Sequence, residues 1–449
     1  MTGPAPCVED GLAGLAAAAR WTDLPARARR YATALTVDAL ANAVAGRSAE
    51  TAAAFEAAAV ALSGRGAHAV CGGQPLAAWA AAGQNAYQMT AHTMCDVYRP
   101  ALCHVTPEVV PAALAAAELA GASGADFLLA AALGYEVTVR VCQALDYPAF
   151  RARGWHSPGV AGALGAAAAA GRLLGLDAGA MAGCLGLAGA QAAGTFAALG
   201  TAAVKFHQAN GARAGLSAAV HTARGFAGSR RILTASDGGI LRAYSGGGRP
   251  RLAVAGLGET WELTHISMRR YPAASTLQAL VDCLLSGQAR QAGPARAVTV
   301  WLPPHAYLLG SGGWDSQLAA MQSARFIAAA AVRHGSCWLD TFSRDRRNDP
   351  EVTAFAERCT DVRCDESLGE GAVRVLLSGR GGEVTMQRNY PRGDSREPLT
   401  GTEVRAKAAR SLAAGLDEGR RAAALAALDG IAAAPRIGEL TGPLAGRPR

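Results

Sequence analysis

The sequence has almost no lysine: 41 of its 43 basic residues are arginine, and the two lysines are Lys205 and Lys407. Arginine carries a planar, permanent charge, whereas lysine supplies a compact charge that burial can remove. A lysine at position 205 in such a chain therefore indicates a place that needs a point charge or a proton donor. The alternative is a lysine that caps a helix end by chance. The functional interpretation is a cationic pocket formed by His156, Lys205 and His207.

Charged and aromatic residues are also scarce. They make up 17% and 6% of the 449 residues, while 51% are hydrophobic and 54 are glycine. Much of the apolar fraction is alanine, the strongest helix former. This composition predicts a mainly α protein whose helices pack closely around a large core, and the length predicts two or more domains.

A signal peptide is not expected at the start of this sequence, and no uninterrupted apolar run of membrane length is seen. Acids stand near the start, where a signal peptide needs bases. The apolar stretch 159–204 is broken by Arg172 and Asp177, which favours a buried helical layer over a membrane span. The ten cysteines include no CxxC pair and are typical of reduced core residues. We therefore expect a cytoplasmic protein without membrane contact.

Positive charge is in excess but does not gather into runs. The net charge is +8, yet the arginines are scattered and do not interleave with aromatic residues. A nucleic-acid partner is therefore not expected. An excess of cations of which a few are buried suits an anionic small-molecule substrate.

Hydrophobic periodicity divides the chain into three parts. Apolar residues at helical spacing predict helices over 31–46, 124–145, 159–175, 178–197 and 210–225. The later part mixes a strand at 297–302, a helix at 322–334 and a hairpin around the turn 379–382. We accordingly expect a large helical domain at 1–261, a smaller α+β domain at 262–394, and helices at 395–449 that return to the large domain.

Several motifs, in this order and spacing, resemble the MmgE/PrpD family, which includes 2-methylcitrate dehydratase, cis-aconitate decarboxylase and iminodisuccinate epimerase. They are DALANAVAG at 38–46, the segment 104–137 beginning HVTPEVVPAALAAAE, GWHSPGVAGALG from 154, VKFHQANGARAG at 204–215, RRYPAAS at 269–275 and YPRG at 390–393. The resemblance covers almost the whole chain. It implies a large all-helical domain, a smaller α+β lid domain and commonly a homodimer, with neither a metal nor an organic cofactor.

The resemblance also implies the catalytic residues. The family's active-site histidines correspond to His104 and His156, and its lysine corresponds to Lys205. His207 lies one residue nearer to the lysine than the family's usual histidine. The chain departs from the family at three further places: an acidic run becomes CDVYR at 95–99, a histidine becomes Ala274, and a tyrosine becomes Phe326.

The remaining candidates are substrate-binding side chains. Arginines can clamp carboxylates through two hydrogen bonds, a tyrosine can replace a lost proton donor, and a serine can donate a hydrogen bond. The candidates are Asp96, Tyr98, Arg99, Arg269, Arg270, Tyr271 and Ser275. A metal site is not expected, because the spacing of His92, Cys95, Asp96, Cys103 and His104 is irregular for a zinc site.

Together these features predict a cofactor-independent lyase or isomerase that acts on a carboxylate substrate. A histidine, His104 or His156, would take the proton next to the carboxylate, and Lys205 would stabilise the negative charge that develops. Dehydration or decarboxylation is the expected outcome, with epimerisation, isomerisation or cyclisation as alternatives. From another class of function, a non-catalytic ligand-binding homologue is favoured by Ala274, Phe326 and the lost acids.

Overall fold

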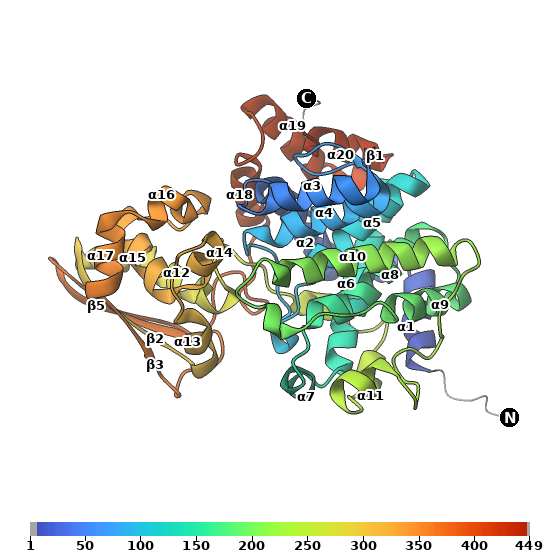
Figure 1. Cartoon of the computed structure of the whole chain (residues 1–449), viewed down its shortest axis with the longest axis horizontal. Helices are drawn as coiled ribbons and strands as arrows, with labels where there is room; N and C mark the ends of the chain where they lie inside the picture. Colours follow the sequence, from blue (N-terminus) through green and yellow to red (C-terminus); the bar gives the residue numbers. More distant parts are fainter. Residues whose placement is uncertain (1–6, 447–449) are drawn as a thin grey trace. The chain divides into compact units, whose positions relative to one another are not determined.

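The computed structural model describes residues 7–446, and contacts within the chain divide it into two compact units (Figure 1). The helical unit comprises the described residues of 1–91, 95–266 and 401–449, and the mixed unit comprises 92–94 and 267–400. The sequence places the smaller domain at 262–394. The helical unit consists of helices with one short strand and the mixed unit adds a sheet, so the expected mainly α fold class is confirmed.

The helical unit contains fifteen of the helices and strands in the described residues. They are α1 (Val8–Ala18), α2 (Ala26–Gly46), α3 (Ala52–Ser63), β1 (Arg65–His68), α4 (Ala78–Ala91), α5 (Thr106–Ala120), α6 (Gly124–Ala144), α7 (Tyr147–Ala152), α8 (Ser157–Leu173), α9 (Ala178–Gly189), α10 (Ala203–Thr222), α11 (Ile240–Ser245), α18 (Gly401–Leu412), α19 (Glu418–Asp429) and α20 (Ile437–Leu444).

Helices α6, α8 and α10 pack against one another (Figure 1), and glycines at their contacts bring the backbones close. A Cβ atom on Gly165 of α8 would lie 1.8 Å from Oγ1 of Thr138 and 2.4 Å from the carbonyl oxygen of Gly134, both in α6. On the other side, a Cβ on Gly215 of α10 would lie 2.4 Å from the Cβ of Ala166. The glycine and alanine content of the sequence is therefore used to bring helix axes close together.

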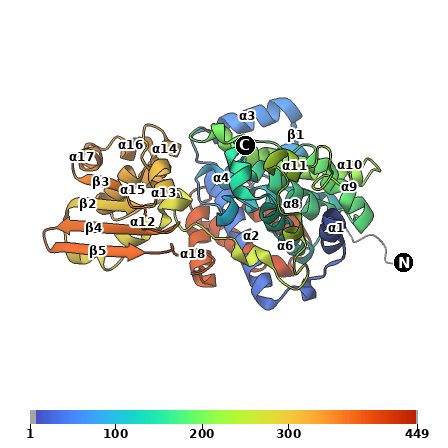
Figure 2. The same ribbon diagram turned by 90° about the horizontal axis from the view of Figure 1, so that it is seen from below.

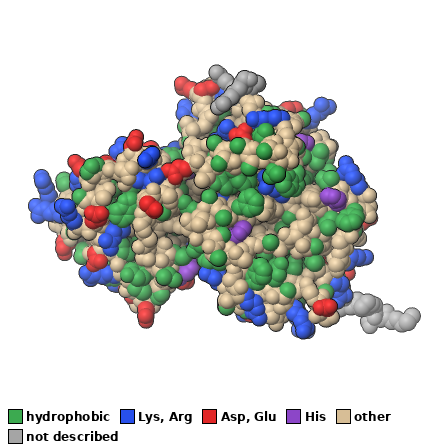
Figure 3. Space-filling model, in the orientation of Figure 1, with side chains coloured by type: hydrophobic (Ala, Val, Ile, Leu, Met, Phe, Trp, Pro, Cys, Tyr) green, Lys and Arg blue, Asp and Glu red, His purple; other side chains and the backbone are tan. Residues whose placement is uncertain are grey.

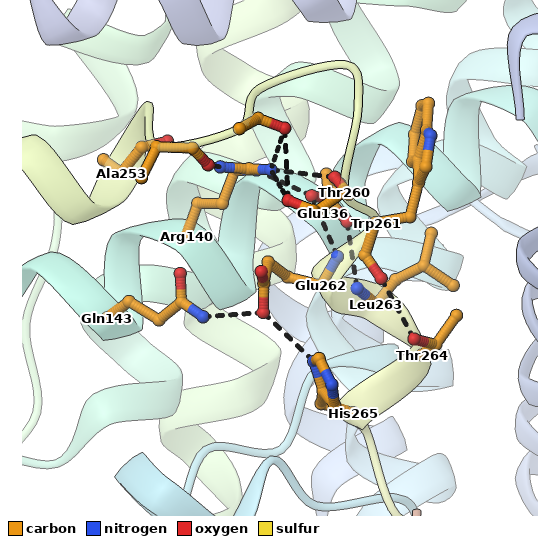
Figure 4. Close-up of polar contacts among 12 residues, drawn as sticks. Glu136, Arg140, Gln143, Ala253, Thr260, Trp261, Glu262, Leu263, Thr264 and His265 are labelled. Carbon is orange, nitrogen blue, oxygen red and sulfur yellow. Dashed lines mark hydrogen bonds and ion pairs between the residues drawn. The ribbon is translucent and has the colours of Figure 1, made fainter.

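A buried ion pair on α6 holds the loop that follows α11 (Figure 4). Arg140 is fully buried, and its Nε lies 2.6 Å from a carboxylate oxygen of Glu136, one helical turn away. The same guanidinium donates to the carbonyl oxygens of Ala255 at 2.8 Å and Thr260 at 2.9 Å. Glu136 also accepts from the backbone N–H of Leu263 at 2.9 Å. The pair is thus satisfied on both sides, as buried charges require.

The C-terminal helices belong to the helical unit through a second buried ion pair. Lys407 of α18 lies 2.8 Å from Asp38 of α2, and both side chains are almost fully buried. Nearby, the Ser411 hydroxyl donates to the side chain of Asn42 at 3.3 Å. The last described helix, α20, is also joined to the helical unit, because the N–H of Gly72, in the segment between β1 and α4, donates to the carbonyl oxygen of Leu444 at 2.7 Å.

The mixed unit is a four-stranded sheet with helices packed against it (Figure 2). Its elements are α12 (Gln278–Leu284), β2 (Ala295–Leu302), α13 (Pro304–Gly310), α14 (Gln317–Gln322), α15 (Ala324–His334), α16 (Arg344–Arg347), α17 (Pro350–Arg358), β3 (Thr360–Cys364), β4 (Val373–Gly379) and β5 (Gly382–Arg388). The strand order is β3-β2-β4-β5, with β2 and β3 parallel and the other pairs antiparallel.

Alternate residues of the sheet enter the core of the mixed unit. Val298 and Val300 of β2 and Val375 of β4 are buried beneath α12 and α15, while their neighbours along each strand are partly exposed. The predicted hairpin is confirmed, since Gly379 pairs with Gly382 across a two-residue turn. Strand β3 was not expected: its sequence TDVRC is short and half-exposed, so it has little of the alternation that marks a strand.

The surface carries no obvious charged stripe on the face shown in Figure 3. There, Lys and Arg side chains are interspersed with Asp and Glu side chains over both units. None of the helices within residues 7–446 is both long and apolar enough to cross a bilayer.

The glycine contacts predict opposite effects for two Gly→Ala substitutions. Gly165→Ala forces a methyl group into the backbone of α6, and we expect a loss of about 1–3 kcal/mol in the free energy of unfolding. Gly14→Ala in α1 has open space around the added methyl group, and we expect a gain of about 0.5–1 kcal/mol from the stiffer helix. Urea unfolding of both variants checks this; equal stability of the two would contradict the packing described.

Candidate active site

The loop 95–105 is held by a single buried carboxylate. Asp96 accepts from the N–H groups of Val105 at 2.8 Å and Thr106 at 3.0 Å, and from the Thr106 hydroxyl at 2.5 Å. These groups form the start of α5, whose first N–H groups have no partner inside the helix. Burial raises the pKa of Asp96 to about 6, against the opposing effect of these hydrogen bonds and of His104. Asp96, a predicted substrate-binding residue, thus supports the loop that carries His104.

His104 is oriented by the same loop. Its Nδ1 lies 2.8 Å from the carbonyl oxygen of Asp96. A carbonyl oxygen only accepts, so Nδ1 carries the proton. In the neutral ring the lone pair therefore stands on Nε2, the atom that can take or return a proton.

A second polar cluster lies where α8 and α10 begin. His156 immediately precedes α8, and its Nδ1 lies 2.9 Å from the Nδ1 of His207 in α10. The Ser157 hydroxyl donates to the carbonyl oxygen of Ala101 at 2.6 Å, which ties this end of α8 to the loop that carries His104. The structure therefore brings the three predicted catalytic histidines to one end of the helical unit.

Helix α10 starts earlier than the sequence indicates. The prediction of a helix from 210 was wrong: α10 begins at Ala203, so Lys205 and His207 lie in its first two turns. Just before the helix, the Thr201 hydroxyl accepts from the N–H of Ala203 at 3.3 Å, while the N-cap residue Ala202 provides no side-chain cap. Residues two apart on a helix point in different directions. Lys205, which is 6% exposed, therefore does not share a face with His207.

The buried histidine lies in a strongly positive environment. The pKa of His156 is held well below its usual value, first by burial and then by the positive groups of His104, His207, Lys205 and Arg151. The pKa of His207 is also lowered, by burial alone. His156 is therefore neutral near pH 7 and able to accept a proton, while the cations around it favour an anion in its vicinity.

Sequence reasoning missed a buried acid, Glu108 of α5. It is fully buried, and neither carboxyl oxygen has a hydrogen-bond partner among the described residues. Glycines face it from two helices: a Cβ on Gly162 of α8 would lie 2.5 Å from the Cγ of Glu108, and one on Gly211 of α10 would lie 2.9 Å from it. Burial first, and then the neighbouring Asp96 and Cys95, raise the pKa of Glu108 well above its usual value. An acid inside the apolar run TPEVVPAALAAA was the available signal.

The other predicted residues of the loop have structural contacts. Tyr98 is 5% exposed and pairs with Cys103 through two backbone hydrogen bonds, while burial raises its side-chain pKa to about 12. Arg99 begins a short 3₁₀ turn, Arg99–Ala101, and is partly exposed. No three His, Cys, Asp or Glu side chains within residues 7–446 are grouped so that they could hold a metal ion.

The four predicted residues at 269–275 belong to the mixed unit. The side chain of Gln278 accepts from the N–H groups of Arg270 at 2.9 Å and Tyr271 at 3.1 Å. Asp282 then accepts from the Tyr271 hydroxyl at 3.2 Å and lies 3.6 Å from the Arg270 guanidinium. The other two candidates lie on either side of this pair of residues. Arg269, which precedes Arg270, is buried, and Ser275 begins the 3₁₀ turn Ser275–Leu277.

Phe326 and Ala274, where the sequence departs from the family it resembles, are apolar residues of the mixed unit. Phe326 is fully buried and packs with Phe342 and Trp314, whose ring centroids lie 6.0 and 6.1 Å away. Ala274 is partly buried against the same core. Neither position carries a proton donor.

Comparison with known proteins gives matches over most of the chain. A family model described as the MmgE/PrpD N-terminal domain matches residues 10–253, and one described as the MmgE/PrpD C-terminal domain matches residues 271–429. A cis-aconitate decarboxylase-like protein of Aspergillus oryzae is 28% identical over 70% of this chain and 71% of its own length. The cis-aconitate decarboxylase of Aspergillus terreus is 29% identical over 74% of each chain, and that of Mus musculus is 27% identical over 59% and 56%.

The buried acid predicts a pH-dependent stability difference. Because the folded pKa of Glu108 is raised, its contribution to stability is complete below the pKa of an unfolded glutamate, about 4.3, and is lost as pH rises towards the folded pKa. Glu108→Gln cannot titrate. We expect it to gain about 1–3 kcal/mol over the wild type between pH 5 and pH 8.

Thermal unfolding of both proteins across this pH range measures the difference. The exposed Glu259 supplies a control: Glu259→Gln should unfold with the same pH dependence as the wild type. A stability difference for Glu108→Gln that does not change with pH would show that the Glu108 carboxyl is already ionised in the folded protein.

Proposed function

The chain belongs to the MmgE/PrpD family, and we propose that it is a cofactor-independent lyase that removes the proton next to a carboxylate in its substrate. The observation that carries the proposal is a neutral, buried His156 among positive groups, in hydrogen-bond contact with His207. The names of the similar proteins support a lyase that acts on a polycarboxylate.

His156 serves as the general base in this proposal. A base must be deprotonated at the working pH, and the lowered pKa of His156 meets that condition. Taking the α-proton leaves the electron pair on the α-carbon of the substrate. The adjacent carboxylate delocalises this pair, and the result is an enediolate. His104, whose Nε2 carries the lone pair in the neutral ring, is then placed to hold or return a second proton.

Lys205 stabilises the charge that develops. It is one of only two lysines in an arginine-rich chain; the other, Lys407, pairs with Asp38, whereas the charge of Lys205 acts on His156. A positive group fixed in a poorly solvated place lowers the free energy of a developing anion far more than it would in water. Collapse of the enediolate then expels a β-hydroxyl group, which leaves as water with the proton that the imidazole took; this is dehydration. Loss of carbon dioxide is the alternative reaction and starts differently: a proton is added to an alkene carbon of the substrate, and the electron pair of the C–CO2 bond that breaks forms the new double bond.

The expected partners follow from the same charges. The substrate is an anionic carboxylate, in keeping with the cations around His156. A homodimer, which the family resemblance implies, stays a prediction that sedimentation analysis of the purified protein would test.

A ligand-binding protein without turnover is the second candidate. This candidate is favoured by the apolar side chains of Phe326 and Ala274. The family resemblance implies a tyrosine and a histidine at these two positions. Reprotonation of the enediolate, which gives isomerisation or epimerisation, is the alternative within catalysis. The first experiment below separates all three.

Lys205→Ala should reduce turnover by a factor of about 100 to 1,000, the range for removing one group that stabilises a developing charge. The assay is proton NMR in deuterium oxide with a panel of di- and tricarboxylates, which reports α-proton loss and the product together. The adjacent Phe206, which is 44% exposed, supplies the control: Phe206→Leu should retain activity and the same melting temperature.

Three results of this assay are informative. An olefinic product formed with loss of water or carbon dioxide supports a lyase, and exchange of the α-proton with formation of an epimer or isomer supports an isomerase. Saturable binding without exchange in the wild type supports the ligand-binding candidate and contradicts the proposal.

The pH profile of kcat/KM should show no decline near the ordinary pKa of histidine. The pKa values of His156 and His207 are both lowered, and a base acts only when deprotonated. We therefore expect kcat/KM to stay level as pH falls from 8 to the ordinary histidine pKa of about 6.5, and to decline only in more acidic solution. A decline centred at or above pH 6.5 would assign the base to a different group.

A further inference from the structure

The contact between His156 and His207 joins two identical atoms. Their Nδ1 atoms lie 2.9 Å apart. Such a contact is a hydrogen bond only if one nitrogen carries a proton and the other offers a lone pair. Two protons would repel, and no proton would leave two lone pairs facing each other. The pair therefore holds one proton between its Nδ1 atoms.

The surrounding backbone fixes this contact. The N–H of His156 donates to the carbonyl oxygen of Gly194 at 3.0 Å. Gly194 has a φ of 132°, and a Cβ there would lie 3.0 Å from both Cγ and Nδ1 of His207. A Cβ on Gly159 would lie 3.5 Å from the Cβ of His207. The ring of His207 thus lies against the backbone of Gly194, in space that a side chain at that position would fill.

The two rings differ in how well they tolerate charge. His156 is 5% exposed, and positive charge on His104 in the loop before α5, on Lys205 of α10 and on Arg151 of α7 disfavours a charge on its ring. His207 is more exposed and faces its partner ring and the glycine backbone. An added positive charge is therefore better tolerated on His207 than on His156.

We propose that His207 is the proton relay of His156: as Nε2 of His156 takes the substrate's α-proton, the proton on its Nδ1 passes to Nδ1 of His207. One C–H bond and one Nδ1–H bond break, and one Nε2–H bond and one Nδ1–H bond form. His156 stays neutral, and the positive charge comes to rest on His207. Reversing the two transfers returns a proton from Nε2 of His156. This inference rests on the proposed function.

The relay gives a reason for the short spacing in this chain between the lysine and the histidine that follows it. Because Lys205 and His207 lie two residues apart on α10, they point in different directions. Lys205 is then available to the substrate's developing charge while His207 bonds to the far side of the His156 ring.

His207→Asn separates a relay from an orienting contact. The amide oxygen of asparagine can accept from Nδ1 of His156 and so preserve its tautomer, but it cannot take the proton. We expect kcat to fall about 100-fold, as for a lost acid–base group, with KM within a factor of about 3. The acid limb of the pH profile should move to lower pH, since protonation of His207 no longer removes the base form of His156.

His221→Asn supplies the matched control. His221 lies on the same helix, is exposed, and bonds through Nδ1 to the carbonyl oxygen of Ser217 at 2.7 Å. The same substitution there should leave kcat, the pH profile and the melting temperature unchanged. Wild-type turnover combined with an equally active His207→Asn variant would overturn the relay while leaving the proposed function intact.

Nitrogen-15 NMR of the imidazole rings tests the relay without turnover. On acidification of the wild type, the signals of His207 should change to those of an imidazolium before those of His156. His207→Asn should raise the pH at which His156 becomes an imidazolium, because the charge of His207 no longer lowers its pKa. If His156 charges first, the relay is wrong. Should the wild type prove inactive towards every acid, the proposed function fails, and this order of titration still decides whether the pair can relay a proton.

Discussion

The contact of helix backbones through glycine is the constraint on which the helical unit depends. Because Gly134, Gly165 and Gly215 add no side chain of their own at the contacts of α6, α8 and α10, these helices approach more closely than larger residues permit. The starts of α8 and α10 then lie near each other, and residues directly before one and inside the other, His156 and His207, meet at hydrogen-bond distance. The chemistry of the cluster is thus a result of the packing below it.

Burial gives the cluster its electrostatic character. Asp96, in the loop 95–105, accepts hydrogen bonds from the N–H groups at the start of α5. The ionisation of Glu108 is disfavoured by burial and by the neighbouring Asp96 and Cys95. The charged groups that act most strongly on His156 are positive. The positive groups around His156 are therefore left to act on whatever anion comes near. This arrangement disfavours an imidazolium at His156 and favours a negative charge beside it.

Much of the fold and part of the candidate site could be predicted from the sequence. The ratio of arginine to lysine singled out Lys205, and helical periodicity located α2, α6, α8 and α15. The start of α10 was misplaced because its N-cap residue, Ala202, provides no side-chain cap and the segment that follows is weakly amphipathic. The role of Asp96 could not be read, since its partners are backbone N–H groups nine and ten residues away that only the folded loop brings to it. Glu108 was overlooked because its burial arises from glycines on two other helices.

The ion pair between Asp38 and Lys407 spans 369 residues of sequence. Contacts so distant along the chain close an entropically costly loop and slow folding. During synthesis from the N-terminus, Asp38 emerges long before Lys407, and every residue of the mixed unit is made in between. The surface of α2 that packs against α18 therefore stays uncovered, with the Asp38 carboxylate among apolar residues, until Lys407 has been made. The helical unit can therefore be completed only after the mixed unit has been made, although most of its residues come first.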